Sequence, residues 1–588
     1  MNELRWRSGD GLFFCLDSEW SANFRLLLAS DSGSDARDGR TWIVPSADAL
    51  ASDGFAERFR PSPTPSHPFG DSLTYTGEWS DDARRALEKL QPSRLCLPCS
   101  SDLSQVSEWT WIRHLQGPKN DAELAKVAGM HWLETLSLRE AFDVTTEGMR
   151  HLAGLNALRE LDLWGTRVGD EGLRHLVELP SLQALNPIGH EFSDDGLPHL
   201  AQMGALERLD LRGARVSGEG LAHLVGAPSL RALNLRHIRL TDADLATLAA
   251  LRSLKRLDLG RTAVSDAGVE AHLTKLSELK YLSLGHTRVG DTGLVHLSRL
   301  AKLRALDLPK TAVSNDGLAP LAELDELDML HLGWTEVGDE GLRHLTGPMR
   351  DLRLNRTPVS DAGLVHLRPM RSLTRLNLSG TGVTDEGLGE LSELTALRML
   401  DLSRTAVSDL KPLAPLVKLE VLDLEATPVD DAGLSAVAKL TTLRSLNLES
   451  TRVGERGLAC VRALTSLYHL SLRGLELTDA AMLHLAGLRA LYSLSLAETK
   501  VTDSGLAHLR GLRSLYDLHL GDTVVSEAGL AHLTGLSSLQ LLYLGGTAVS
   551  ERCPRRLPQL LCHRRPMPEF EHLPPDSQLP SGSSSPPV

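Results

Sequence analysis

The sequence predicts an α/β solenoid, in which short parallel strands form a sheet on one face and short helices cover the other. The main observation is a repeat of about 24 residues, LxxLxLxxTxVxDxGLxxLxxLxx, that runs from about Leu133 to Val549. The second Leu of each LxL lies at 138 in the first repeat and at 544 in the last, and Pro187 takes this place once, which gives eighteen repeats. A fixed period in this range indicates that each repeat buries its apolar side only by stacking on its neighbours.

Each repeat is expected to contain a strand, a turn and a short helix. The LxxLxL segment is short, alternating and bounded by a turn, which is typical of a strand. The turn ends in Ser or Thr followed by Asp, as at Ser265-Asp266 and Thr384-Asp385, which predicts a helix N-cap with an acid in the first turn. The Leu residues of GLxxLxxL lie three apart, which suits a two-turn helix or a 3₁₀ segment.

The repeat resembles that of leucine-rich repeat proteins, in the ribonuclease-inhibitor-like and cysteine-containing branch, where TDxGLxxL is typical. This resemblance covers about 420 residues of the chain. It implies a curved horseshoe with the parallel sheet on the concave face, short helices on the convex face, and protein ligands bound on the sheet. Two repeats are two residues short: Val407–Leu416 (VSDLKPLAPL), which resembles the internalin type, and the one that includes Thr346–Asp351 (TGPMRD).

The N-terminal region before the repeats is expected to be rich in strands and of unknown type over residues 1–59. Its apolar runs are Gly11–Leu16, Phe24–Leu28 and Thr41–Val44, separated by Ser, Asp and Gly turns. Residues 60–72 contain the Pro-rich segment RPSPTPSHP and are expected to form a linker.

Caps are expected at both ends of the solenoid, because its core needs to be covered there. Residues 73–132 contain SDDARRALEKL, a predicted helix with Ser80 as its N-cap, and degenerate repeats around Leu95–Leu97 and Ile112–Leu115. The solenoid itself is assigned to residues 133–552. Residues 553–588 are expected to hold a remnant of the C-terminal cap and a tail, Pro574–Val588, that is disordered by composition.

Charge and composition exclude several classes of partner and location. The net charge of −14 is spread along the chain and argues against nucleic acid and anionic membranes, both of which need a basic patch. No apolar run of 18 residues predicts a membrane span, and the N-terminus does not resemble a secretory signal. Six cysteines in so long a chain are no disulfide framework, so a cytoplasmic location is expected.

No pattern in the sequence predicts catalysis, a cofactor or a metal. There is no GxSxG, HExxH, phosphate-binding Gly loop or kinase signature. The single CxxC, Cys96 to Cys99, cannot complete a tetrahedral zinc site. His occupies the GLxHL position in ten repeats, but no acidic or Cys partner recurs beside it, so partly buried surface histidines are expected there. The chain is therefore expected not to be an enzyme.

A ladder of Thr residues follows the LxL in thirteen repeats, from Thr166 to Thr547. We expect each hydroxyl to satisfy backbone groups of adjacent coils, since buried turn amides need such partners.

A second ladder is formed by the residue between the two inward Leu of each repeat. It is mostly Asp or Asn, as at Asp162, Asn186, Asp210, Asn234 and Asp258. Two interpretations stay open: a solvated ladder that compensates its own charges between strands about 5 Å apart, or a polar docking surface for a basic protein ligand.

Tyrosines are concentrated in the last repeats. Tyr468, Tyr492 and Tyr516 lie 24 residues apart and replace the Arg or Lys of earlier repeats, and Tyr543 follows them. Tyr is enriched at binding hot spots. The first three share the parity of the inward Leu, so exposure is open to them only at the strand entrance, where the Arg and Lys of earlier repeats must reach water. A stack that merely reflects repeat duplication is the alternative.

The most probable function is therefore that of a non-enzymatic scaffold that binds a protein ligand on the concave face. The candidate contact residues are Tyr468, His469, Tyr492, Tyr516, His519, Tyr543, Asp210, Asp258, Asp307, Trp164 and Trp334. A substrate-recognition adaptor of the F-box, ubiquitin-ligase-like kind is one alternative, and an enzyme with its activity in the N-terminal region is another.

Overall fold

A computed structural model describes residues 41–44, 72–75, 81–91, 94–96, 103, 106–187, 192–536, 538–539, 541–549 and 561–563. The chain forms two compact units, Met1–Asp423 and Leu424–Val588, each of which is described by itself. The predicted strands at residues 11–16 and 24–28, the Pro-rich segment and the C-terminal tail lie outside the described residues.

Parallel strands form the sheet of each unit, and each strand pairs with the next one along the chain. The strands of the first unit are β1 (Thr41–Val44), β2 (Ser72–Tyr75), β3 (Arg94–Cys96), β4 (His114–Gln116), β5 (Thr135–Ser137), β6 (Glu160–Asp162), β7 (Ala184–Asn186), β8 (Arg208–Asp210), β9 (Ala232–Asn234), β10 (Arg256–Asp258), β11 (Tyr281–Ser283), β12 (Ala305–Asp307), β13 (Met329–His331), β14 (Asp351–Arg353), β15 (Arg375–Asn377), β16 (Met399–Asp401) and β17 (Val421–Asp423). Those of the second unit are β18 (Ser445–Asn447), β19 (His469–Ser471), β20 (Ser493–Ser495), β21 (Asp517–His519), β22 (Leu541–Tyr543) and β23 (Leu561–His563).

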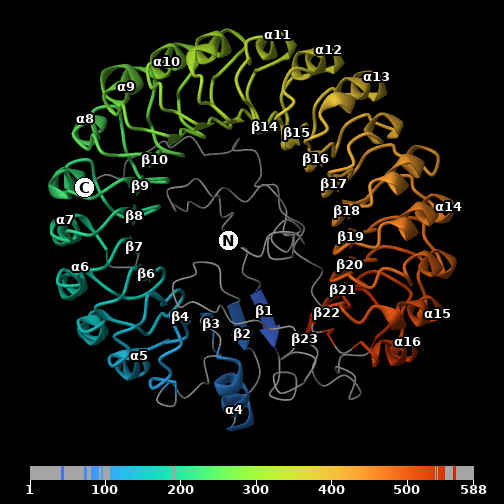
Figure 1. Ribbon diagram of the computed structural model, residues 1–588, viewed down its shortest axis with the longest axis horizontal. Coiled ribbons are helices and arrows are strands. Elements are labelled where there is room, and N and C mark those ends of the chain that lie inside the picture. Colours follow the sequence, from blue (N-terminus) through green and yellow to red (C-terminus); the bar gives the residue numbers. More distant parts are fainter. Residues whose placement is uncertain are drawn as a thin grey trace, which may run out of the picture. The chain divides into compact units, whose positions relative to one another are not determined.

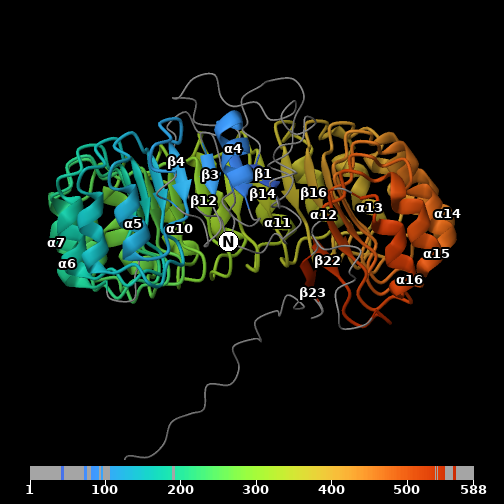
Figure 2. The same cartoon turned by 90° about the horizontal axis from the view of Figure 1, so that it is seen from below.

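Short helices cover the other face of each sheet (Figures 1 and 2). The α-helices are α4 (Asp81–Leu90), α5 (Asp121–Val127), α6 (Asp170–Leu173), α7 (Leu197–Ala201), α8 (Leu245–Leu248), α9 (Asp266–Ala271), α10 (Asp291–Leu297), α11 (Asp339–Leu342), α12 (Asp361–Leu364), α13 (Asp385–Leu388), α14 (Glu455–Leu458), α15 (Asp503–Leu506) and α16 (Glu527–Leu530). The 3₁₀ segments are η2 (Thr146–Leu152), η3 (Arg174–Leu176), η4 (Asp194–Gly196), η5 (Gly220–Gly226), η6 (Leu273–Lys275), η7 (Asp316–Glu323), η8 (Val365–Leu367), η9 (Gly389–Glu393), η10 (Lys411–Leu413), η11 (Gly433–Lys439), η12 (Ala459–Ala463), η13 (Asp479–His484), η14 (Ala507–Gly511) and η15 (Ala531–Leu533). The predicted alternation of strand, turn and two-turn helix or 3₁₀ segment is thus confirmed.

The parallel ladder begins upstream of the repeats that the sequence reveals. The predicted strand Thr41–Val44 is present as β1, and it pairs in parallel with β2, which in turn pairs with β3. The helix expected from SDDARRALEKL is also present, as α4. The strands of the predicted N-terminal region and cap therefore continue the sheet of the first unit.

The Leu residues of the repeat form the core between sheet and helices. Leu282, Leu306 and Leu330 face one another in register on β11, β12 and β13, and all three are fully buried. Burying each such side chain stabilises the fold by roughly 1.5–3 kcal/mol. The middle residue of each strand points into the core, so its two neighbours point to the opposite side, which we call the sheet face.

Adjacent coils are joined by an acidic side chain, which we call the carboxylate clamp. The Asp that begins a helix accepts two hydrogen bonds from the Ser or Thr N-cap of the next coil. Asp361 Oδ1 accepts from the Thr384 backbone N–H at 2.8 Å, and Oδ2 accepts from the Thr384 hydroxyl at 2.6 Å. Asp291 binds Ser314 in the same way, at 2.7 and 2.6 Å. The acid predicted for the first helical turn therefore serves mainly the next coil.

The clamp explains the Gly of the DxGL motif. A Cβ at Gly387 would lie 2.3 Å from Asp361 Oδ1, and a Cβ at Gly363 would lie equally close to Asp339 Oδ1. The carboxylate of the preceding coil occupies the space that any larger residue needs. Gly is required here by this close approach, and its backbone conformation is ordinary.

The Thr ladder uses its hydroxyls differently from the prediction. Thr311 Oγ1 donates to the carbonyl oxygen of Leu308, at 2.7 Å, and Thr357 Oγ1 donates to that of Leu354, at 2.6 Å. The acceptor is thus in the same coil, and the expectation of a bond to adjacent coils was wrong. The chain turns directly after the strand, which brings the hydroxyl back over a carbonyl that has left the sheet.

No helix in the described part of the chain has the length and apolar character needed to cross a membrane.

We expect Gly387→Ala to destabilise the first unit by about 1–3 kcal/mol, because the new Cβ would collide with Asp361. Gly389→Ala is the matched control, since a Cβ there meets nothing within 4 Å and Ala favours helix over Gly. Urea denaturation of the full chain, followed by circular dichroism, compares the two midpoints. Equal midpoints would contradict the steric role of the clamp.

Candidate functional site

Three predicted tyrosines form a continuous stack in the second unit. Tyr468, Tyr492 and Tyr516 each precede a strand, β19, β20 and β21 respectively. The ring centroids of Tyr468 and Tyr492 lie 4.7 Å apart with an interplanar angle of 7°, and those of Tyr492 and Tyr516 lie 4.7 Å apart at 9°. The backbone N–H of each later Tyr donates to the carbonyl of the preceding one at 2.8 Å, so the spacing of the coils sets the spacing of the rings.

All three rings are half-buried, so they are partly exposed where their strands begin, which is the possibility that the parity of the strand had left open. Burial raises the pKa of the Tyr516 hydroxyl to about 12 and also raises the pKa values of Tyr468 and Tyr492. The stack is therefore uncharged at neutral pH. It offers a flat, rigid and neutral aromatic surface with hydroxyl groups along it.

A second aromatic pair lies on the sheet face of the same unit. His519 and Tyr543 occupy paired positions on β21 and β22, and their ring centroids are 4.1 Å apart. His519 Nε2 also contacts the carboxylate of Asp517, with its nearest oxygen at 2.9 Å. Ser493 Oγ donates to the other oxygen of that carboxylate at 3.2 Å. These contacts hold the imidazole of His519 flat against Tyr543.

His469 is the least satisfied polar group of the candidate set. It lies on β19 between Ser445 and Ser493, and it is only 3% exposed. Neither of its ring nitrogens has a hydrogen-bond partner in the described structure. Burial lowers its pKa to about 4, so the imidazole is neutral at pH 7. Leaving such a buried group unpaired costs about 1–3 kcal/mol, which favours a role that involves a partner group.

The acidic candidates lie on the sheet face of the first unit, and their carboxylates accept hydrogen bonds from groups of the same chain. Asp210 accepts from the Arg212 backbone N–H at 3.0 Å, and the Arg212 side chain lies 3.3 Å from its other oxygen. Burial nevertheless raises the pKa of Asp210. Asp258 accepts from the Gly260 N–H at 2.8 Å. This geometry favours the self-compensating interpretation of the Asp and Asn ladder in this unit.

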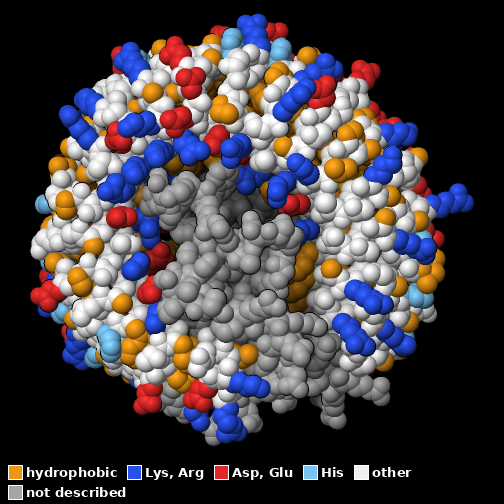
Figure 3. All heavy atoms as spheres, in the orientation of Figure 1, with side chains coloured by type: hydrophobic (Ala, Val, Ile, Leu, Met, Phe, Trp, Pro, Cys, Tyr) orange, Lys and Arg blue, Asp and Glu red, His pale blue; other side chains and the backbone are white. Residues whose placement is uncertain are grey.

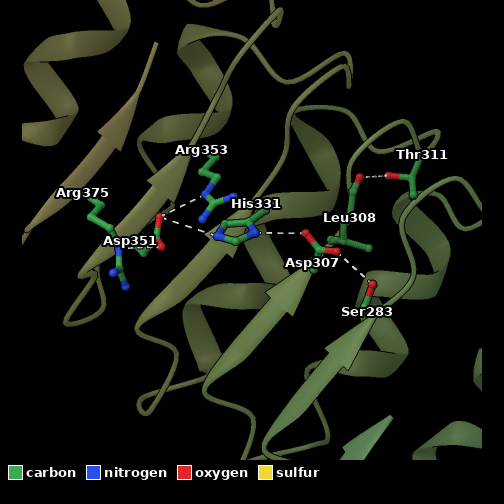
Figure 4. Close-up of polar contacts among 8 residues, drawn as sticks. All are labelled: Ser283, Asp307, Leu308, Thr311, His331, Asp351, Arg353 and Arg375. Atoms are coloured by element: carbon green, nitrogen blue, oxygen red, sulfur yellow. Dashed lines mark hydrogen bonds and ion pairs between the residues drawn. The ribbon is translucent and has the colours of Figure 1, made fainter. Parts of the chain in front are cut away.

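Asp307 belongs to a polar network that crosses five strands, β11 to β15 (Figure 4). It accepts from Ser283 Oγ at 2.8 Å and from His331 Nδ1 at 3.0 Å. The other ring nitrogen of His331 lies 3.5 Å from Asp351 Oδ1, a charge contact that is too long for a good hydrogen bond. Asp351 is also contacted by Arg353 Nε at 3.4 Å and by Arg375 Nε at 2.9 Å.

The cationic neighbours dominate the electrostatics of this network. Burial by itself raises the pKa of Asp351, but Arg353, His331 and Arg375 outweigh it and hold that pKa far below the ordinary range. Burial of Asp307 is likewise outweighed by the bonds from His331 and Ser283, so its pKa is lowered. Both carboxylates are therefore ionised in the folded chain.

His331 and Arg353 occupy the ladder position between the two inward Leu of their repeats, but the sequence did not identify Asp351 as their partner. Asp351 stands where the neighbouring repeats carry Ala305, Met329, Arg375 and Met399, and it closes the shortened TGPMRD segment. An acid at this position of an atypical repeat was the signal that could have pointed to the network.

The two tryptophan candidates lie in the first unit beside cationic groups. Trp164 is half-buried, with the Arg139 guanidinium 4.7 Å from its ring centroid. Trp334 is 38% exposed. The Lys310 ammonium lies 4.7 Å and the Arg356 guanidinium 4.3 Å from the ring centroid of Trp334.

No group of His, Cys, Asp and Glu residues that could hold a metal ion occurs among the described residues. The histidines of the GLxHL position are half-buried, except for the exposed His223. The environments of the CxxC cysteines lie outside the described residues. The adaptor and enzyme alternatives depend largely on residues 1–40 and 45–71, which also lie outside them, and both stay predictions.

Comparison with known proteins supports the repeat architecture. A family model described as a leucine-rich repeat matches residues 250–271, 275–298 and 370–392. Each of these segments contains one strand, its turn and the helix that follows, so the matches fall on the coils of the structure. The chain is a leucine-rich repeat protein. No curated protein matches this leucine-rich repeat chain in sequence.

Several solved structures are similar to this leucine-rich repeat protein. An internalin (inlF) from Listeria monocytogenes is 23% identical, with a TM-score of 0.46, over 59% of this chain and 93% of that one. A leucine-rich repeat protein from Leptospira interrogans is 18% identical, with a TM-score of 0.33, over 76% and 98%. The ectodomain of a membrane receptor kinase from Arabidopsis thaliana, in complex with CASPARIAN STRIP INTEGRITY FACTOR 2, is 15% identical, with a TM-score of 0.28, over 89% and 86%.

We expect Asp351→Asn to destabilise the first unit by about 3 kcal/mol at pH 7, because it leaves the buried His331 and the half-buried Arg353 and Arg375 without their carboxylate. The wild-type carboxyl has a folded pKa below its ordinary value of 3.8, so its contribution is present above that pH and is lost as the pH falls further. The variant should therefore lose less stability than the wild type below about pH 4.

Denaturant midpoints measured from pH 7 to pH 3 test this expectation, with the exposed Asp325→Asn as the control. A variant that matches the wild type at pH 7, or one that keeps the full acid sensitivity, would show that the network does not stabilise the unit.

Proposed function

We propose that this protein is a non-enzymatic scaffold that binds a protein ligand on the sheet face of its leucine-rich repeats. Solenoids suit this function, because stacked repeats present an extended and preformed surface. The stacked tyrosines at 468, 492 and 516 are the observation that carries the proposal. We assign the main contact to them and to the adjacent polar and aromatic residues of the second unit.

The rigidity of this surface supports a binding role. A side chain that is already fixed by stacking loses little conformational entropy when a partner covers it. Tyr combines a large apolar ring with a hydroxyl that can donate or accept a hydrogen bond, which is why it is frequent at binding hot spots. The three rings also replace Arg or Lys of earlier repeats, so the repeat itself does not require an aromatic residue there.

The polar groups beside the stack define what a ligand should offer. Asp517 provides a carboxylate on the sheet face beside the ring of His519, and the tyrosines provide their hydroxyl groups. A ligand segment that carries both a hydrogen-bonding group and a cationic side chain complements these residues. The proposal therefore favours a protein ligand with basic or amide side chains at its contact surface.

The test is affinity capture from the native cell with the full chain and three variants. The Tyr468→Ala/Tyr492→Ala/Tyr516→Ala variant should reduce recovery of the captured ligand at least about tenfold, which corresponds to about 1.4 kcal/mol. The corresponding triple Tyr→Phe variant keeps the stack and removes the hydroxyls, so it separates the two contributions.

The matched control removes exposed apolar side chains elsewhere in the same unit. Leu483 is 50% exposed and Val524 is 65% exposed, and the Leu483→Ala/Val524→Ala variant should capture the ligand as the wild type does. Undiminished capture by the triple Ala variant would overturn the assignment of the site to the tyrosine stack. Equal loss in the control would assign the effect to general destabilisation of the unit.

A further inference from the structure

A row of side chains follows the strands in the middle of the first unit. In five consecutive coils, the residue directly before the ladder Thr is Arg261, His286, Lys310, Trp334 and Arg356. All five have a left-handed backbone, with φ between 53° and 62°. We call this row the basic ridge.

The backbone of the ridge is fixed by bonds between coils. The N–H of Arg261 donates to the Gly285 carbonyl at 2.8 Å, and that of Lys310 donates to the Gly333 carbonyl at 2.9 Å. A side chain in the left-handed region costs roughly 1–2 kcal/mol. Gly takes the same position, also with positive φ, at 165, 213 and 380. These coils therefore place cationic and aromatic side chains at a left-handed backbone position that Gly would adopt with less strain.

Trp334 is the fourth of the five ridge residues and lies between cations from the coils on either side. The Lys310 ammonium and the Arg356 guanidinium lie 4.7 and 4.3 Å from its ring centroid. Such cation–π contacts orient the two charged groups and contribute about 0.5–1 kcal/mol each at exposed sites. These contacts hold the side chains of Lys310 and Arg356 in place but do not neutralise their charge, so the ridge stays cationic.

Within the described part of the chain, no carboxylate forms an ion pair with the cations of the ridge, Arg261, Lys310 and Arg356. Burial, together with the positive charges of Arg261 and Lys310, lowers the pKa of His286 to about 4. Lys and Arg side chains gather along the inner margin of the face shown in Figure 3, over the region of β10 to β16. A positive field therefore persists in a chain whose net charge is −14.

The repeat does not require cations at this position. In the second unit, the same position is occupied by Ala426, Ser450, Gly474, Glu498, Asp522 and Gly546. The basic character thus belongs to a particular run of coils. A structural requirement shared by all repeats cannot explain it.

We propose that the basic ridge is a second docking surface and that it binds an acidic segment of a protein partner. Carboxylates of the segment pair with Arg261, Lys310 and Arg356, and the exposed edge of Trp334 offers an N–H and an apolar surface between them. Strands of a sheet lie about 4.8 Å apart, so Arg261 and Arg356, four coils apart, are separated by about 19 Å along the sheet. An extended peptide covers this distance in about six residues.

The observations favour a peptide over a nucleic acid. A polynucleotide gains its affinity by neutralising many phosphates, whereas the ridge presents few cations on a chain of strong net negative charge. A short acidic segment can stay on the ridge and avoid repulsion from the rest of the surface. This surface lies in a different unit from the tyrosine stack, so the inference goes beyond the function proposed above and can fail or succeed independently of it.

The test measures binding of a fluorescein-labelled deca-glutamate peptide to the full chain by fluorescence anisotropy at low ionic strength. Lys310→Gln/Arg356→Gln should weaken binding about tenfold. The control is Arg252→Gln/Lys418→Gln, which removes the same charge from two exposed residues that precede their strands and lie away from the ridge. The control should change the affinity less than about twofold, and wild-type binding should weaken as salt is added.

Three outcomes would overturn the proposal. One is that deca-glutamate does not bind the wild type. Another is that both double variants lose the same affinity, which would indicate a general charge effect. The third is that a thymidine 20-mer or vesicles containing phosphatidylserine bind more tightly than deca-glutamate and lose this binding in the ridge variant, which would assign the ridge to another class of anion. Unchanged circular dichroism of both variants shows that loss of binding does not reflect unfolding.

Discussion

The carboxylate clamp between adjacent coils is the interaction on which the rest of the structure depends. One Asp at the start of a helix satisfies both the backbone N–H and the hydroxyl of the next N-cap, as Asp361 does for Thr384. Where the clamp is present, a helix N-terminus obtains a partner from the neighbouring coil, so these repeats cannot be satisfied alone. The clamp also dictates Gly in DxGL, because the carboxylate fills the space of a Cβ. Electrostatics and sterics therefore select the same motif.

Because successive coils are spaced evenly, residues at the same position of successive repeats lie side by side in a row. When Leu fills the row, the result is a core, and when the residue differs from the consensus, the result is a surface with its own chemistry. The tyrosine rings of the second unit are 4.7 Å apart because their backbones are joined coil to coil. The same principle lines up His331 between Asp307 and Asp351 on the sheet face. The candidate binding surfaces of this chain therefore lie where several consecutive coils carry the same departure from the repeat consensus.

The regular repeat made the fold predictable from the sequence. The contacts between coils could not be predicted in this way. The Leu pattern predicted the strands, the core and the short helices, and the N-cap Ser80 with the helical spacing of the following apolar residues predicted α4. The pattern missed β2 at Ser72–Tyr75, because SLTY lacks the repeat consensus. It also missed the acceptor of the Thr hydroxyls, which depends on how sharply the chain turns after the strand. The stacking of Tyr468, Tyr492 and Tyr516 follows from their spacing of 24 residues, and their role as a binding site stays a prediction. The unpaired nitrogens of His469 and the role of Asp351 depend on neighbours about 24 residues away, which no local pattern reveals.

The two units differ in the physical basis of the surfaces they present. The tyrosine stack is neutral, since burial raises the pKa of its hydroxyls, so its interactions should depend little on salt. The basic ridge carries positive charge that no described carboxylate pairs with, so long-range attraction should contribute to association there and weaken as salt is added. Charged surfaces mainly accelerate encounter and select partners, whereas buried aromatic contacts mainly slow dissociation. A leucine-rich repeat chain with both surfaces can select a partner by charge on one unit and retain one by aromatic contact on the other.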